Sequence, residues 1–115
     1  MKPKKLIRNF VTHNLKKEEW ETITDRDELN RLYALKIREE LAEIQASEHK
    51  DIAEFADLIT VVLSFAKQNG FTHDQLQRAM FDKCFEKGVF SNTALNNLNP
   101  NNPSNKLYFE TKNNE

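Results

Sequence analysis

Helix-breaking residues are missing from a long stretch of this sequence. The chain has two glycines and three prolines, and residues 4–69 contain neither type. The same stretch is rich in Leu, Ala, Glu and Lys, which have high helix propensity. We therefore predict an all-α fold. Because glycine is so scarce, the glycine-rich phosphate loops of Rossmann and P-loop proteins are excluded.

The composition narrows the class of protein further. A length of 115 residues is typical of one domain. The 17 Lys and Arg residues nearly balance the 18 Asp and Glu residues, so we expect no nucleic-acid polymer and no membrane surface as partner. The single Cys84 excludes an internal disulfide and a cysteine-based zinc cluster. Since neither a membrane span nor a signal peptide is visible, we expect a cytoplasmic protein.

Two long helices are predicted from the spacing of apolar residues, at residues 25–46 and 50–69. Either Thr24 or Asp25 is suited to cap the first helix. The polar turn at residues 47–50 is short, which makes the two helices antiparallel neighbours. The predicted core is therefore an antiparallel helical hairpin.

A third helix has clear start and stop signals. The second helix ends at Gly70, a residue suited to a left-handed C-cap. Thr72 and Gln75 then form the pattern of a capping box, and the third helix ends at Gly88.

The flanking segments differ in character from the helices. Residues 20–24 alternate apolar and polar side chains, which favours a short strand. Nine of the residues in 91–115 are Asn, so we divide the chain into a domain at 1–90 and an Asn-rich tail at 91–115. We expect residues 92–105 to be mobile or irregular and residues 107–109 to dock as a short strand.

The predicted helix at 50–69 is apolar on two sides. One stripe comprises Ile52, Phe55, Ile59, Val62, Leu63 and Ala66, and the other comprises Leu58, Val61 and Phe65. A helix with two apolar sides must be surrounded, and this chain offers few helices to do so. We therefore expect subunits to associate into a helical-bundle dimer or tetramer.

Acidic residues occupy matching positions on the first two helices. Glu40 and Glu43 are three residues apart and share one face, and so do Glu54 and Asp57. If these faces meet, Glu43 lies opposite Glu54. Glu40 then lies opposite Asp57, because both pairs are symmetric about the turn. Four converging carboxylates repel one another, so we expect a hard cation among them: Mg²⁺, with Mn²⁺ as an alternative.

A different interpretation of these acids stays open. Glu39, Glu40 and Glu43 are also typical of a solvated helix face with Lys or Arg partners. Residues 52–65, which contain Glu54, include no basic residue, so the salt-bridge interpretation explains that segment less well. The alternative is a non-catalytic helical interaction module.

The acids resemble the EExxE…ExxD signature of the MazG-like all-α nucleoside triphosphate pyrophosphohydrolases. The matching residues are Glu39, Glu40, Glu43, Glu54 and Asp57. Residues 5–8 resemble the KLVRDKI opening of the phosphoribosyl-ATP pyrophosphohydrolase-like branch, and residues 85–90 resemble its K-R-G-G-F element. The likeness covers about residues 4–90.

The resemblance implies a house-cleaning hydrolase that cleaves nucleotides between the α- and β-phosphates, giving a nucleoside monophosphate and pyrophosphate. It implies that Mg²⁺ is held by Glu40, Glu43, Glu54 and Asp57. Glu39 and Glu40 are the catalytic candidates. Glu39 is expected to act as the base for the attacking water, as an indirect ligand, or as a surface residue only.

The same resemblance implies that cationic side chains bind the substrate phosphates. The candidates are Arg8, Lys83 and Lys87, with Lys5 as a weaker one. A phosphoribosyl-ATP pyrophosphohydrolase of histidine biosynthesis is the alternative enzyme.

Overall fold

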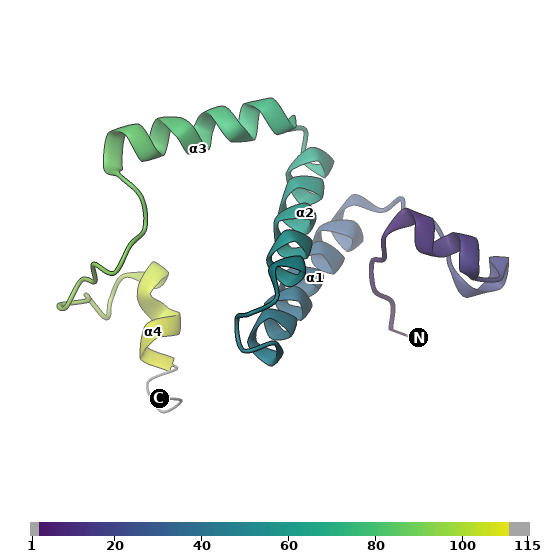
Figure 1. The fold of residues 1–115 in the computed structure, drawn as a ribbon, viewed down its shortest axis with the longest axis horizontal. Helices are drawn as coiled ribbons and strands as arrows, with labels where there is room; N and C mark the ends of the chain where they lie inside the picture. The colour runs from purple at the N-terminus through teal and green to yellow at the C-terminus, as the bar shows by residue number, and fades with distance from the viewer. Residues whose placement is uncertain (1–2, 111–115) are drawn as a thin grey trace. The chain divides into compact units, whose positions relative to one another are not determined.

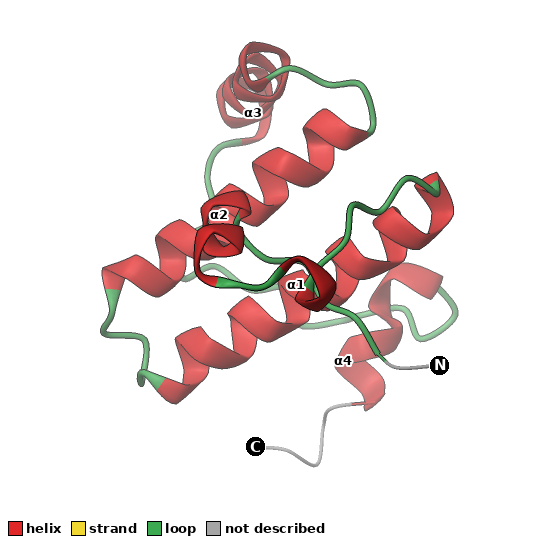
Figure 2. Ribbon diagram, turned by 90° about the vertical axis from the view of Figure 1, so that its right-hand side faces the viewer, coloured by secondary structure: helices red, strands yellow, loops and turns green. Residues whose placement is uncertain are grey.

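The computed structural model describes residues 3–110, and within that range the chain is all-helical, as predicted (Figure 1). The described residues contain no strand (Figure 2). The helices are η1 (Asn9–Asn14), η2 (Lys17–Glu19), α1 (Arg26–Ala46), α2 (Ile52–Gln68), α3 (His73–Lys87), η3 (Pro103–Asn105) and α4 (Lys106–Glu110), where η marks a 3₁₀-helix. None of the described helices has the length and apolarity that crossing a bilayer requires.

Two compact units make up the chain, Met1–Asp82 and Lys83–Glu115. The first contains the N-terminal segment, α1, α2 and most of α3, and it holds the site described below. The second contains the end of α3, the Asn-rich segment and α4. The functional division after residue 90 stays a prediction.

Helices α1 and α2 pack side by side as the predicted hairpin (Figure 1). The Asp25 side chain caps α1 by accepting a hydrogen bond of 2.9 Å from the Glu28 N–H, so Asp25 rather than Thr24 is the N-cap. The turn reverses direction through two residues with left-handed backbone, Glu48 and His49. Far from the turn, the Asn69 side chain donates to that of Asn30, as antiparallel helices require.

Few apolar side chains of the first unit are fully buried. Leu32 and Ile44 of α1 form the buried core of the described residues, at 1% and 3% exposure. By contrast, α2 keeps large apolar side chains exposed, including Ile52 at 84% and Ile59 at 59%. Among the described residues, these apolar side chains of α2 are therefore not part of a buried core.

The predicted start of α3 is confirmed. The Thr72 N–H donates to the Gln75 side chain at 2.8 Å, and the Gln75 N–H donates to the Thr72 hydroxyl at 3.1 Å. Gly70 and Gly88, which flank the helix, have φ values of 93° and 83°. A left-handed backbone favours glycine at both positions, so the helix ends predicted at these two glycines are confirmed.

Two predicted strands are wrong. Residues 20–24 belong to no helix or strand, because no neighbouring strand offers them a backbone partner within the described chain. Residues 107–109 lie in α4 instead of a strand. The Asn102 side chain accepts a hydrogen bond from the Ser104 N–H, which starts a 3₁₀ turn that leads directly into α4. The preceding residues from 91 onward are irregular, as predicted.

Candidate metal centre

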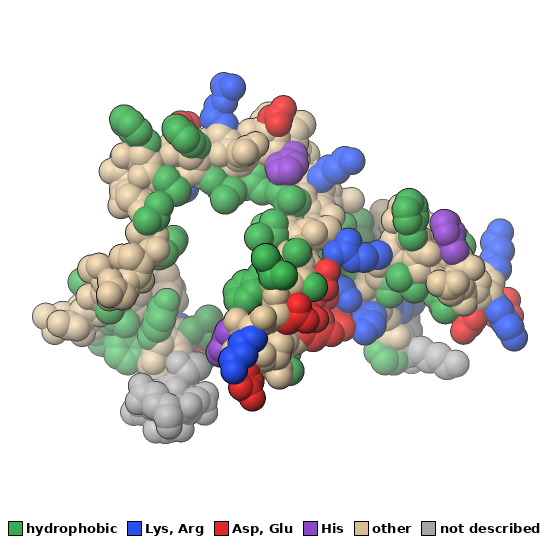
Figure 3. All heavy atoms as spheres, in the orientation of Figure 1, with side chains coloured by type: hydrophobic (Ala, Val, Ile, Leu, Met, Phe, Trp, Pro, Cys, Tyr) green, Lys and Arg blue, Asp and Glu red, His purple; other side chains and the backbone are tan. Residues whose placement is uncertain are grey.

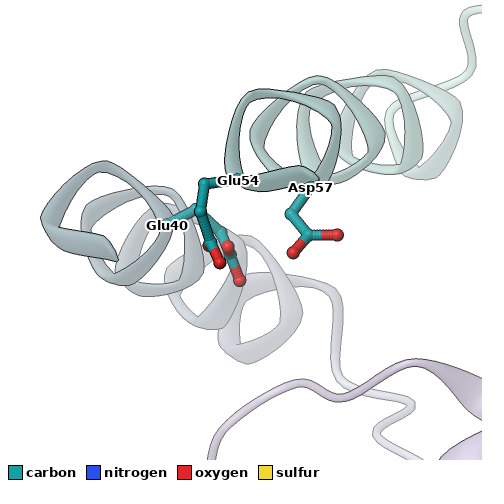
Figure 4. A group of neighbouring side chains, drawn as sticks. All are labelled: Glu40, Glu54 and Asp57. Atoms are coloured by element: carbon teal, nitrogen blue, oxygen red, sulfur yellow. The ribbon is translucent and has the colours of Figure 1, made fainter. Parts of the chain in front are cut away.

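Three carboxylates from two helices converge in the first unit. Glu40 reaches from α1 toward Glu54 and Asp57 of α2 (Figure 4). One oxygen from each of the three lies within 4.8 Å of the others. Glu54 and Asp57 point the same way because they are one helical turn apart on the face of α2 that packs on α1. The register predicted from the turn thus places Glu40 beside Asp57.

Two carboxylate oxygens of this cluster are buried without a hydrogen-bond partner. They are the Oε2 atoms of Glu40 and Glu54. Glu40 is the one buried charged residue in the described part of the chain, at 5% exposure. Buried polar atoms are normally satisfied, and an unsatisfied one costs free energy. A proton or a cation bound at these oxygens would remove that cost.

The pKa values of Glu40 and Glu54 are both raised, as expected of buried carboxylates that lie close to other acids. Burial raises the pKa of Glu40 above its usual value, and the neighbouring Glu43 carboxylate raises it further. Burial is also the main cause that raises the pKa of Glu54, with Glu43 again adding to it. Glu43 itself is exposed and is not among the three closest carboxylates, so it lies at the edge of the cluster. A bound cation would relieve both effects.

Basic side chains pair with two of the three carboxylates. Arg8, on the N-terminal segment, forms an ion pair with Asp57. Lys36, 16% exposed, has its Nζ atom 3.6 Å from a Glu40 oxygen. Glu54 has no ion pair among the described residues. Sequence reasoning missed Lys36, although its spacing of four residues before Glu40 is the signal that could have identified it.

Glu39 lies outside the three-carboxylate cluster. Its carboxylate pairs with Lys5 at 2.9 Å and with Lys36 at 3.1 Å. The hydrogen bond from Lys5 is the main cause that lowers the pKa of Glu39. Glu39 is thus an ionised, partnered acid beside the cluster, and its catalytic role stays a prediction.

The remaining predicted phosphate ligands, Lys83 and Lys87, lie elsewhere in the chain. Both are exposed on the last turns of α3, in the unit Lys83–Glu115. Their role stays a prediction. The cations that the structure places near the carboxylates are Lys5, Arg8 and Lys36.

A cavity of about 580 Å³ opens beside the carboxylates. Glu40, Asp57, Arg8 and Lys36 line one part of it, and the rest is lined by the N-terminal segment and the facing sides of α1 and α2. Acidic side chains gather over the α1–α2 pair, with Lys and Arg side chains beside them (Figure 3). Ligand sites commonly have volumes of about 300–1,000 Å³, so the volume of this cavity is in the range of small-molecule sites.

Comparison of the chain with protein-family models, with curated proteins and with solved structures finds no match. The chemistry of the site therefore has to be argued from its own residues. Its donors are all carboxylate oxygens, with no Cys or His in the group. Oxygen donors, negative charge and unpartnered buried atoms fit a hard divalent cation such as Mg²⁺ or Mn²⁺.

Proposed function

We propose that this protein is a Mg²⁺-dependent nucleotide pyrophosphohydrolase that cleaves between the α- and β-phosphates. The observation that carries the proposal is the cluster of Glu40, Glu54 and Asp57. Glu40 and Glu54 each have one buried oxygen without a hydrogen-bond partner, and Glu40 and Asp57 line a cavity together with Lys5, Arg8 and Lys36. The likeness of the two acidic motifs to those of the MazG-like pyrophosphohydrolases supports the same reaction.

Glu40, Glu54 and Asp57 would hold the metal, with Glu43 at the edge as a further oxygen donor. A bound Mg²⁺ polarises phosphoryl oxygens and lowers the pKa of a bound water. Lys36 lies 3.6 Å from a Glu40 oxygen and would help to hold that carboxylate beside the metal.

The surrounding residues supply charge and a proton acceptor. Arg8 lines the cavity and is free to exchange its Asp57 partner for a phosphate oxygen, because its side chain is 60% exposed. Lys5 lines the same cavity. Glu39 is the candidate base for the attacking water, and the Lys5 hydrogen bond that lowers its pKa keeps it ionised but also makes it a weaker proton acceptor. Lys83 and Lys87 remain candidates for phosphate contacts.

An alternative function is favoured by the ion pairs themselves. A non-catalytic helical module, in which the acids only stabilise the fold, is expected to have such ion pairs. They are Arg8 with Asp57, Lys36 with Glu40 and Lys5 with Glu39. Such a module does not explain why Glu54 has a buried oxygen and no cationic partner.

The alternative enzyme is a phosphoribosyl-ATP pyrophosphohydrolase of histidine biosynthesis. Only the substrate distinguishes it from a pyrophosphohydrolase that acts on nucleoside triphosphates.

Self-association in the cytoplasm belongs to the same proposal. The exposed apolar side chains of α2, including Ile52, Phe55 and Ile59, need a cover, and a second copy of the chain in a dimer or tetramer supplies one.

A pyrophosphate-release screen tests the function. Standard and damaged nucleoside triphosphates, together with phosphoribosyl-ATP, are incubated with the protein and Mg²⁺. We expect release from at least one nucleotide and its loss in Glu54→Gln, which removes one charge. Glu18→Gln removes an exposed charge from η2 and should keep the activity. Absence of release from every nucleotide, or equal activity in both variants, would refute the proposal.

A further inference from the structure

The cavity beside the carboxylates continues along the hairpin away from the turn. On α1, its wall is formed by Tyr33, Lys36 and Glu40, which share one helical face. On α2, the wall extends from Asp57 to Ser64. Each wall runs over eight residues, or seven steps of 1.5 Å, so the groove is about 10 Å long. Tyr33 and Ser64 are symmetric about the turn in the same way as Glu40 and Asp57.

The two ends of this groove differ in chemistry. Arg8 and Lys36 lie at the carboxylate end, where the charges are. Two turns away, the lining contributed by the helices consists of Tyr33 on α1 and Ser64 on α2, and Val61 lies one turn nearer to Asp57. A ligand that matches both ends has an anionic group at one end and an uncharged, largely flat group at the other.

At the aromatic end, the Tyr33 ring stacks on α2, and hydroxyl groups also line the groove. The Tyr33 ring stacks on Phe65 of α2, with centroids 5.1 Å apart and planes at 8°. The Tyr33 phenol is neutral near pH 7, and burial raises its pKa further from that pH. The Thr60 hydroxyl donates to the Ala56 carbonyl at 2.8 Å and is thereby left as an acceptor toward the groove. Ser64 adds a second hydroxyl.

We infer that this groove binds the nucleoside part of the substrate and that Tyr33 is the residue against which the base lies. The inference rests on the proposed function and deepens it, because it assigns the direction in which the substrate lies. The phosphates lie between Arg8, Lys36 and the carboxylates, and the base lies toward the far end of α2. Thr60 and Ser64 then face the edge of the base or sugar and contribute to selection.

Three variants separate recognition from fold stability. Tyr33→Leu removes the aromatic surface from the groove, and Tyr33→Phe keeps it. Phe65→Leu is the matched control, because it breaks the same aromatic stack from the side that does not line the groove. Thermal unfolding of all three shows whether the two Leu variants lose similar stability.

Binding is measured by calorimetry in the presence of Mg²⁺. The probes are a panel of nucleoside monophosphates and, as the ligand without a ring, inorganic phosphate. We expect the parent to bind at least one nucleoside monophosphate more tightly than phosphate. Tyr33→Leu should weaken that binding about tenfold, the effect of losing one base stack, and leave phosphate binding unchanged. Tyr33→Phe and Phe65→Leu should stay within about threefold of the parent.

Two results would overturn the inference: equal weakening in Tyr33→Leu and Phe65→Leu, or a parent that binds monophosphates no better than phosphate. If the parent protein releases pyrophosphate but binds monophosphates no better than phosphate, the proposed function holds and the groove is not the nucleoside site. Conversely, Tyr33-dependent monophosphate binding without pyrophosphate release from any nucleotide would support the groove and refute the function.

Discussion

Replacing Glu40 with Gln should stabilise the metal-free protein. Glu40 is 5% exposed, and its oxygen lies within 4.8 Å of the Asp57 carboxylate. Two full charges 4.8 Å apart repel by about 3.5 kcal/mol at an effective dielectric constant of 20. Lys36 and Arg8 offset part of this repulsion. We therefore expect the free energy of unfolding to rise by about 1 kcal/mol in Glu40→Gln.

The gain should depend on pH in a defined direction. Because the folded state raises the pKa of Glu40, the ionised form is disfavoured there. The contribution of Glu40 to stability is therefore fully present below the usual Glu pKa of 4.5 and is lost as the pH rises through the raised pKa. Gln does not titrate, so the stability difference between Glu40→Gln and the parent should grow from pH 4.5 to pH 7.5.

Urea unfolding in a chelating buffer, repeated at several pH values, measures this difference, with Glu18→Gln as control. Mg²⁺ at about 100 times its dissociation constant should then stabilise the parent by about 2.7 kcal/mol, and Glu40→Gln far less. If the acids only form salt bridges, Glu40→Gln breaks a buried pair with Lys36 and loses about 3–5 kcal/mol at every Mg²⁺ concentration. That outcome would refute the reasoning.

The other predictions concern phosphate binding, the core and assembly. Arg8→Gln breaks an ion pair whose Arg side chain is 60% exposed, so the free energy of unfolding should change by less than about 1 kcal/mol. Because Arg8 is proposed to bind a phosphate, KM for the nucleotide should rise about tenfold, and an unchanged KM would contradict this role. Leu32→Ala should cost about 3 kcal/mol in urea unfolding, because Leu32 is 1% exposed; a loss below about 1 kcal/mol would show that Leu32 is not core. Light scattering should give at least twice the chain mass of 13.5 kDa, and a monomer at micromolar concentration would contradict the assembly.

Helical geometry explains why the hairpin and its carboxylates were predictable. Once the turn was located, the spacing of Glu40 and Asp57 about it placed them opposite each other. The caps at Asp25 and Thr72 are local signals, and both form the expected hydrogen bonds.

Contacts between distant segments were not predictable in the same way. The Lys5 and Arg8 ion pairs depend on how the N-terminal segment crosses the hairpin, and no local pattern encodes that path. The Tyr33–Phe65 stack depends on side-chain packing between helices. The strand predicted at residues 20–24 failed because alternation alone does not supply a pairing partner.

The central claim is that Glu40, Glu54 and Asp57 form a divalent-cation site, and Mn²⁺ binding followed by electron paramagnetic resonance tests it most directly. Free Mn²⁺ gives a sharp spectrum that is lost on binding, so a titration counts bound ions without requiring a substrate. We expect the parent and Glu18→Gln to bind at least one Mn²⁺ per chain, in competition with Mg²⁺, and Glu54→Gln to bind it at least about tenfold more weakly. Equal Mn²⁺ binding by the parent and Glu54→Gln, or none by the parent at millimolar Mn²⁺, would contradict the claim.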